Sequence, residues 1–188
     1  MAAVAAAFGH VVVDVGAGDG GYVLHRARTE PTTFAVAIDA SADGLVRGAW
    51  RAKRAGIRNV AFLVDGVERL PRELHRVADE VTVHFPWGSL LRGLVGGSGA
   101  VVGPIASLMK AGAELRVLMS ANDRGVSEIT PSAVASRRVA YAEHGLHLID
   151  ARWASAGSVA ESRSAWAKRL AAGRARHAVM ARYRRDVT

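Results

Sequence analysis

The feature of the sequence that most constrains its fold is a run of apolar residues that ends abruptly in glycines. Residues 11–13 are three valines, residues 14–21 read Asp-Val-Gly-Ala-Gly-Asp-Gly-Gly, and a helix-like stretch follows at residues 22–29. Valines favour a buried strand, and glycines allow a backbone to turn tightly and approach a ligand. The start of the next helix offers unpaired N–H groups. This segment therefore predicts a strand, a ligand-binding loop and a helix.

Asp14 distinguishes between the ligands that such a loop can hold. Gly16, Gly18 and Gly21 match the dinucleotide fingerprint, but a strand end that cradles a pyrophosphate has no use for a carboxylate two residues before the first glycine. A ligand with a cationic ammonium or sulfonium does have a use for it. S-adenosylmethionine (SAM) carries both groups, and SAM-dependent methyltransferases use the Asp-x-Gly-x-Gly-x-Gly pattern that ends here at Gly20. A tight turn without a ligand is the alternative.

Short apolar runs alternate with amphipathic stretches along the rest of the chain. Further strands are predicted at residues 34–38, 60–64, 81–85, 114–119, 146–153 and 177–183. Helices are predicted after Asp43 and at residues 98–109, 131–143 and 161–172, and a turn at residues 110–112. This alternation predicts an α/β fold with a seven-stranded, mostly parallel sheet and helices on both faces. Neither a repeat nor a linker interrupts the 188 residues, so one domain is expected.

Two further acidic positions suit a nucleoside ligand. Asp39 ends the second predicted strand, about 20 residues past the glycines, where a carboxylate can bind both ribose hydroxyls of SAM or NAD. An N-terminal helix cap is the alternative role for Asp39. The loop after the third strand, which lies over the adenine in this layout, contains Val67 and Glu68. Val67 is predicted to pack on the ring and Glu68 to accept from its amine, and a surface ion pair is the alternative for Glu68.

Two tryptophans stand in settings that favour contact with a nucleobase. Trp87 follows the fourth predicted strand and Pro86, at the edge of the sheet where ligand crevices open. Trp166 has Lys168 and Arg169 as neighbours, and an aromatic surface beside cations is what base stacking and phosphate contact require. A place in the core is the alternative for Trp87.

The charge of the chain favours a polyanionic partner. Its 25 Lys and Arg outnumber its 17 Asp and Glu, which gives a net charge of +8. Residues 151–188 hold nine basic and two acidic residues, and residues 47–58 hold a second basic cluster. A solvated helix face would explain either cluster alone, but the two together favour nucleic acid.

The residue types that are missing also limit the chemistry. Without cysteine the chain has no disulfide, thiolate metal site or cysteine nucleophile, and its seven histidines show no metal-ligand spacing. Residues 1–8 are apolar but lack the basic start of a signal peptide, and residues 94–109 are too short to span a bilayer. A cytoplasmic protein without a metal and without membrane association is expected.

Taken together, the motifs resemble those of the aminoglycoside-resistance 16S ribosomal RNA (adenine(1408)-N(1))-methyltransferases of the KamB/NpmA type. The resemblance covers most of the chain and rests on the glycine loop, Asp39 and the stretches at residues 68–71, 86–93 and 164–170, which read Glu-Arg-Leu-Pro, Pro-Trp-Gly-Ser-Leu-Leu-Arg-Gly and Ser-x-Trp-x-Lys-Arg-Leu. It implies a Rossmann-like class I methyltransferase fold, SAM as methyl donor, and N1 of the decoding-site adenine in the 30S subunit as acceptor. A monomer is expected.

The resemblance also implies roles for individual residues. The loop with Asp14, Gly16, Gly18 and Gly20 would hold the methionine part of SAM, Asp39 the ribose, and Val67 with Glu68 the adenine. Trp87 and Trp166 would sandwich the flipped target base, with Pro86, Ser89 and Ser164 nearby. RNA contacts are expected from Arg47, Arg51, Lys53, Arg54, Lys168, Arg169, Arg174 and Arg176.

Two departures from the family pattern keep other functions open. Only ten residues precede the first predicted strand, where the family usually has a β-hairpin, and the segment of residues 120–138 is short. Part of the RNA-docking surface is therefore expected to be missing. The alternatives are a weakly active or inactive relative that binds SAM and RNA, a small-molecule SAM methyltransferase, and an NAD-dependent oxidoreductase.

Overall fold

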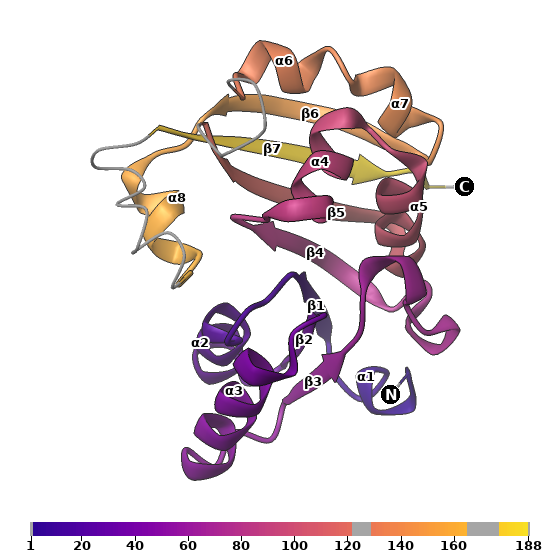
Figure 1. Cartoon of the computed structure of the whole chain (residues 1–188). Coiled ribbons are helices and arrows are strands. Elements are labelled where there is room, and N and C mark those ends of the chain that lie inside the picture. Colours follow the sequence, from indigo (N-terminus) through magenta and orange to yellow (C-terminus); the bar gives the residue numbers. More distant parts are fainter. Residues whose placement is uncertain (1, 122–128, 165–176, 188) are drawn as a thin grey trace.

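The strands of the protein form one twisted sheet, which Figure 1 shows with helices on both faces. The computed structural model describes residues 2–121, 129–164 and 177–187. Within these ranges the strands are β1 (His10–Val15), β2 (Thr33–Asp39), β3 (Val60–Val64), β4 (Ala78–His84), β5 (Met109–Ser120), β6 (Leu146–Trp153) and β7 (Ala178–Arg185). Their order is β3-β2-β1-β4-β5-β7-β6, and β7 alone runs antiparallel to its neighbours. The predicted seven-stranded, mostly parallel sheet is confirmed.

The helices divide between the two faces of the sheet. In the described ranges they are α1 (Ala2–Ala5), α2 (Gly21–Thr29), α3 (Ala42–Arg54), α4 (Gly88–Gly96), α5 (Gly99–Leu108), α6 (Pro131–Ala135), α7 (Arg138–Ala142) and α8 (Ala156–Glu161), with 3-10 turns η1 (Val67–Arg69) and η2 (Arg72–Leu74). Helices α2 and α3 cover β1–β3 on one face, and α4 to α7 cover the other.

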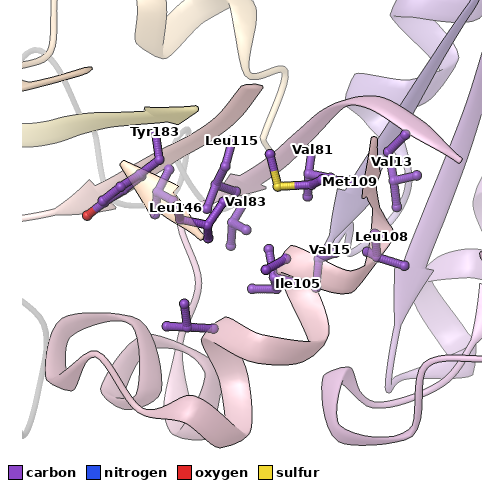
Figure 2. Packing of buried hydrophobic residues seen from close by; sticks show 14 of the residues in the cluster. Val13, Val15, Val81, Val83, Ile105, Leu108, Met109, Leu115, Leu146 and Tyr183 are labelled. Carbon is purple, nitrogen blue, oxygen red and sulfur yellow. The ribbon is translucent and has the colours of Figure 1, made fainter. Parts of the chain in front are cut away.

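The main core lies between the sheet and helices α4 to α7. Val13 and Val15 of β1 and Val83 of β4 pack there with Ile105 and Leu108 of α5, and all five are buried (Figure 2). Burying one such side chain stabilises the fold by about 1.5–3 kcal/mol. The alternation of side chains along a strand leaves the opposite face of β1 and β4 for polar groups. The core therefore fixes the strand ends from which the site is built.

Local predictions differ from the structure at three places. The turn predicted at residues 110–112 is part of β5, because Gly112 adopts a φ of 74° and the register with β4 shifts between Ala78 and Glu80. The helix predicted at residues 131–143 is two short helices, α6 and α7. Most of the helix predicted at residues 161–172 lies outside the described residues, and Glu161 ends α8 instead.

Helix α4 was not predicted, because its glycines are typical of a loop. Gly93 is needed there for packing, since a Cβ at this position would overlap the side chain of Val101 in α5. No single helix of the described ranges is long and apolar enough to cross a membrane; α4 and α5 reach that size only as a pair, bent by 92°.

Candidate active site

A cleft of about 690 Å³ opens at the carboxyl ends of β1, β2 and β4. Strand β1 lies between β2 and β4, so the order of the strands reverses there, and such switch points are where α/β sheets bind ligands. The lining comes from the loop after β1, the beginning of α3, the end of β4 and residues 162–164 beyond α8. Segments far apart in the sequence thus meet at one opening.

The glycine loop has the backbone that the SAM pattern requires. Gly16, Gly18 and Gly20 have φ values of 75°, 58° and 68°, in the left-handed region that favours glycine. Gly21, the last glycine of the dinucleotide fingerprint, is not among the residues with positive φ. The loop therefore needs glycine at the positions of the methyltransferase pattern. Gly16 and Gly18 line the cleft, whereas a Cβ on Gly20 would lie 2.7 Å from the ring of Phe62.

Asp14 supplies a buried carboxylate that lines the same cleft. Its side chain is 2% exposed, and Oδ1 accepts a hydrogen bond of 2.7 Å from the hydroxyl of Thr82. Nδ1 of His84 lies 3.3 Å from the same oxygen. A buried carboxylate needs a positive partner or strong hydrogen bonds. This surrounding fits a ligand that brings an ammonium or a sulfonium.

Asp39 is held by backbone groups on both sides of the cleft. Oδ2 accepts from the N–H of Gly18 and Oδ1 from the N–H of Ser41, each at 2.8 Å. Ser41, not Asp39, is the N-cap residue of α3, so the alternative role of Asp39 as helix cap is wrong. A carboxylate fixed in this way presents its remaining lone pairs to a pair of ribose hydroxyls.

The structure does not bring Val67 and Glu68 into the cleft. Val67 packs partly buried against the main core, and Glu68 is exposed in η1. The ion pair of this loop joins Arg69 to Asp65, at 3.3 Å. Contact of Val67 and Glu68 with an adenine ring stays a prediction.

Trp87 projects into solvent at the mouth of the cleft. Phe85 has a φ of 50°, donates its N–H to the carbonyl of Leu118 and buries its ring beneath α8. This left-handed turn buries Pro86 and leaves Trp87 68% exposed, so the alternative of a core tryptophan is wrong. Ser89 is exposed, and neither Pro86 nor Ser89 lines the cleft.

The segment after α8 closes another side of the cleft. Arg163 and Ser164 line it, and a Cβ on Gly21 would lie 3.0 Å from the carbonyl oxygen of Arg163. The predicted Ser164 is therefore at the site, and Arg163 is a lining residue that the sequence motifs missed. Five predicted residues lie outside the described ranges: Trp166, Lys168, Arg169, Arg174 and Arg176.

His84 and Tyr22 also line the cleft without having been predicted. Their rings meet edge to face with centroids 4.5 Å apart. The Tyr22 hydroxyl donates to Glu80 at 3.2 Å and accepts from Arg26 at 2.6 Å. Burial and the charge of Glu80 raise the pKa of Tyr22 above its ordinary value, so the phenol stays protonated. The period of two along β4, which puts Glu80 and His84 on the face of Asp14, is the signal that could have found His84.

The basic residues of α3 have different surroundings. Arg47 lines the cleft, and Arg51 pairs with Asp19 of the glycine loop, 3.0 Å between Nη2 and Oδ2. Lys53 and Arg54 are exposed. Gly44 and Gly48 let α3 lie directly on the loop, since a Cβ at either position would overlap a backbone oxygen of residues 18–19.

A glycine loop of this pattern, a buried Asp14 and a fixed Asp39, on a sheet with one antiparallel strand, define a class I SAM-dependent methyltransferase. Within this class, residues 1–184 match the family model for NpmA, 16S rRNA (adenine(1408)-N(1))-methyltransferase. The chain belongs to this family, as the motifs predicted.

Individual relatives agree with this assignment. The 16S rRNA (adenine(1408)-N(1))-methyltransferase of Streptoalloteichus tenebrarius is 34% identical over 91% of this chain and 85% of its own length. The enzyme of the same name from Escherichia coli is 28% identical over 90% and 84%. A crystal structure of the Catenulisporales acidiphilia enzyme, a tryptophan-to-alanine mutant with cosubstrate SAM, superposes with a TM-score of 0.89 at 28% identity, over 98% and 89% of the two chains. The methyltransferase KamB gives 0.85 at 30% identity, over 98% and 91%.

Proposed function

We propose that this chain transfers the methyl group of SAM to N1 of adenine 1408 of 16S rRNA in the 30S subunit, and that it thereby confers aminoglycoside resistance. The carrying observation is that one cleft combines the buried carboxylate of Asp14 with the exposed indole of Trp87. The first suits a cationic methyl donor and the second suits a flipped nucleobase. The names of the relatives supply the identity of the base.

Residues of three strand ends are assigned to the cofactor. Asp14 and the loop of Gly16, Gly18 and Gly20 hold the methionine part, and Asp39 binds the ribose. Val67 and Glu68 complete the adenine subsite. When bound, SAM supplies an electrophilic methyl group next to the base site.

The acceptor nitrogen needs no general base, because N1 of a neutral adenine has an in-plane lone pair and carries no proton. The work of the protein is therefore to orient N1, which replaces a bimolecular encounter by a fixed geometry. The base must first leave its stack in the rRNA helix. Trp87 replaces that stacking on one side and Trp166 on the other, with Pro86, Ser89 and Ser164 around them. The indole faces also stabilise the positive charge of the methylated purine.

The rest of the docking surface is assigned to cations. Arg47, Arg51, Lys53 and Arg54 of α3 act together with Lys168, Arg169, Arg174 and Arg176. Contacts of this kind neutralise phosphates and fix the register of the protein on the RNA. We further propose that the chain works as one methyltransferase domain and as a monomer in the cytoplasm.

One experiment tests the proposal. The protein is incubated with 30S subunits and labelled SAM, and the modified nucleotide is mapped by reverse transcription. A methyl group on the Watson–Crick edge blocks the transcriptase, so a new stop is expected at adenine 1408. Label in 30S without that stop would place the reaction elsewhere, and binding of SAM without transfer of label would identify an inactive relative.

A further inference from the structure

Helix α3 exposes a large aromatic side chain on its outer face. The inner face of the helix buries Gly44, Leu45 and Ala52 against the glycine loop and the sheet. On the outer face Trp50 is 60% exposed and Val46, four residues earlier, is 51% exposed. Positions four residues apart are neighbours on a helix, so the two side chains form one small apolar surface. A tryptophan in solvent forgoes a large gain from burial.

The catalytic cleft does not account for Trp50. The residue is not among those that line the cleft, and it belongs to none of the buried clusters of the described residues. Arg47 does line the cleft, and Trp50 lies three residues further along the same helix, a rise of about 4.5 Å. Trp50 therefore stands next to the cleft, at a distance that an RNA engaged there would cover.

The charges around Trp50 select the kind of partner. Arg47, Lys53, Arg54 and Arg58 are all exposed, and Asp43 is the one acidic residue between positions 42 and 58. The Lys53 ammonium lies 5.3 Å from the centroid of the Trp50 ring. An aromatic surface with a cation at its side is suited to a stacked base and its phosphate. A surface of this charge attracts a polyanion and repels a second copy of itself.

We infer that Trp50 is a stacking contact for an unpaired nucleobase of the RNA, outside the catalytic cleft. Lys53 then neutralises a phosphate of the same nucleotide or of the next one. This inference rests on the proposed function, because it takes RNA as the substrate. Pairing of two copies through this face is disfavoured by area as well as by charge. Two side chains fall far short of the roughly 800 Å² per partner that a stable interface buries.

The test compares Trp50→Ala, Trp50→Leu and Trp50→Phe in binding to 30S subunits. Loss of the indole is expected to weaken binding about 5- to 100-fold, the equivalent of about 1–3 kcal/mol for one stacked base. Leu should fail to restore binding although it is apolar, and Phe should restore most of it. The SAM affinity and the melting temperature should stay unchanged, and so should the slope of affinity against salt, since no charge is removed.

Val139→Ala is the matched control, because Val139 is an apolar residue of α7 that is 64% exposed. Equal 30S binding by Trp50→Ala and the wild type would overturn the inference, and so would full recovery with Leu, which would indicate plain apolar burial. A change in sedimentation of Trp50→Ala without a change in RNA affinity would assign the face to a protein contact and would also overturn it.

The same variants separate this inference from the proposed function. A wild type that methylates adenine 1408 while Trp50→Ala binds 30S normally keeps the function and removes the stacking contact. A wild type that leaves 30S unmodified removes the function instead. In that case affinity for a single-stranded oligouridine decides alone: weaker binding by Trp50→Ala supports stacking, and equal binding overturns it.

Discussion

Arg51 of α3 holds Asp19 of the glycine loop through both its side chain and its backbone. Nη2 lies 3.0 Å from Oδ2 of Asp19 and also donates to the Asp19 carbonyl oxygen. The other carboxylate oxygen of Asp19 accepts from the N–H of Gly21, the first residue of α2, at 3.2 Å. One arginine thus joins the helix predicted to dock RNA to the loop predicted to bind SAM.

Replacing Arg51 by Ala should loosen the loop and weaken SAM binding. The pair is half exposed, so its contribution is small, about 1 kcal/mol or roughly a five-fold rise in the dissociation constant. Calorimetry with SAM measures it. Arg54→Ala is the matched control and should leave SAM affinity unchanged while it weakens 30S binding. If Arg51→Ala bound SAM like the wild type, the contact would have no role in the cofactor site.

Asp39→Ala should weaken SAM binding by about 1.5–3 kcal/mol, the range for losing hydrogen bonds to a charged group. The carboxylate is assigned to the ribose and also holds the N–H groups of Gly18 and Ser41, so both the ligand and the loop lose a partner. Titration calorimetry with SAM and with NAD measures the change, and NAD should bind to neither protein. Equal SAM affinity in the variant would remove Asp39 from the site.

Trp87→Ala should reduce methylation more than it reduces binding to 30S. One stacking contact of about 1–3 kcal/mol is lost, and the alignment of N1 is loosened as well. Phe at this position should retain part of the activity, because an aromatic face remains. SAM affinity should change little. Trp166→Ala is expected to behave in the same way.

Trp153→Ala serves as the control for the ring itself, because Trp153 is 47% exposed and does not line the cleft. Methylation at the wild-type rate by Trp87→Ala would refute the base contact. A fall of both melting temperature and SAM affinity would indicate a structural role instead.

Glu114 should make stability depend on pH in acid. Bidentate hydrogen bonds of 3.0 Å from Arg182, joined by Arg116, hold the pKa of Glu114 at about 2, below its ordinary value of 4.5. A carboxyl group with a lowered pKa stabilises the fold above pH 4.5, and this contribution is lost as the pH falls toward 2. Glu114→Gln should therefore be less stable than the wild type at pH 7, by at most about 3 kcal/mol.

Denaturation of both proteins between pH 7 and pH 2.5 measures this effect. The difference in unfolding free energy should narrow below pH 4.5, because the wild-type carboxyl approaches protonation. A difference that stays constant down to pH 2.5 would show that the charge of Glu114 is not what stabilises the sheet.

Sequence patterns predicted those parts of the fold and site that depend on local chemistry. The valine run before Asp14 and the glycines after it determine the first strand and its loop, and the positive φ values fall on Gly16, Gly18 and Gly20 as the methyltransferase pattern requires. Trp87 was placed correctly because Pro86 restricts the chain directly after a buried strand. These features need no knowledge of distant contacts.

The parts that were missed depend on contacts between distant segments. Helix α4 forms in spite of its glycines because Gly93 lies against Val101 of α5. His84 reaches the cleft through the pairing of β4 with β1, and Arg51 turns to Asp19 only because α3 folds back onto the loop. Such contacts follow from strand order and helix packing, which no short motif determines.

The close approach of α3 to the glycine loop has a mechanical consequence. At Gly44 and Gly48 no side chain separates the helix from the backbone of Gly18 and Asp19, so no compressible layer lies between them. A force applied to the outer surface of α3 reaches the loop as a displacement and is not absorbed by rotamer changes on the way. The helix and the loop therefore behave as one rigid lever, with Trp50 on its outer arm and Gly18 on its inner arm.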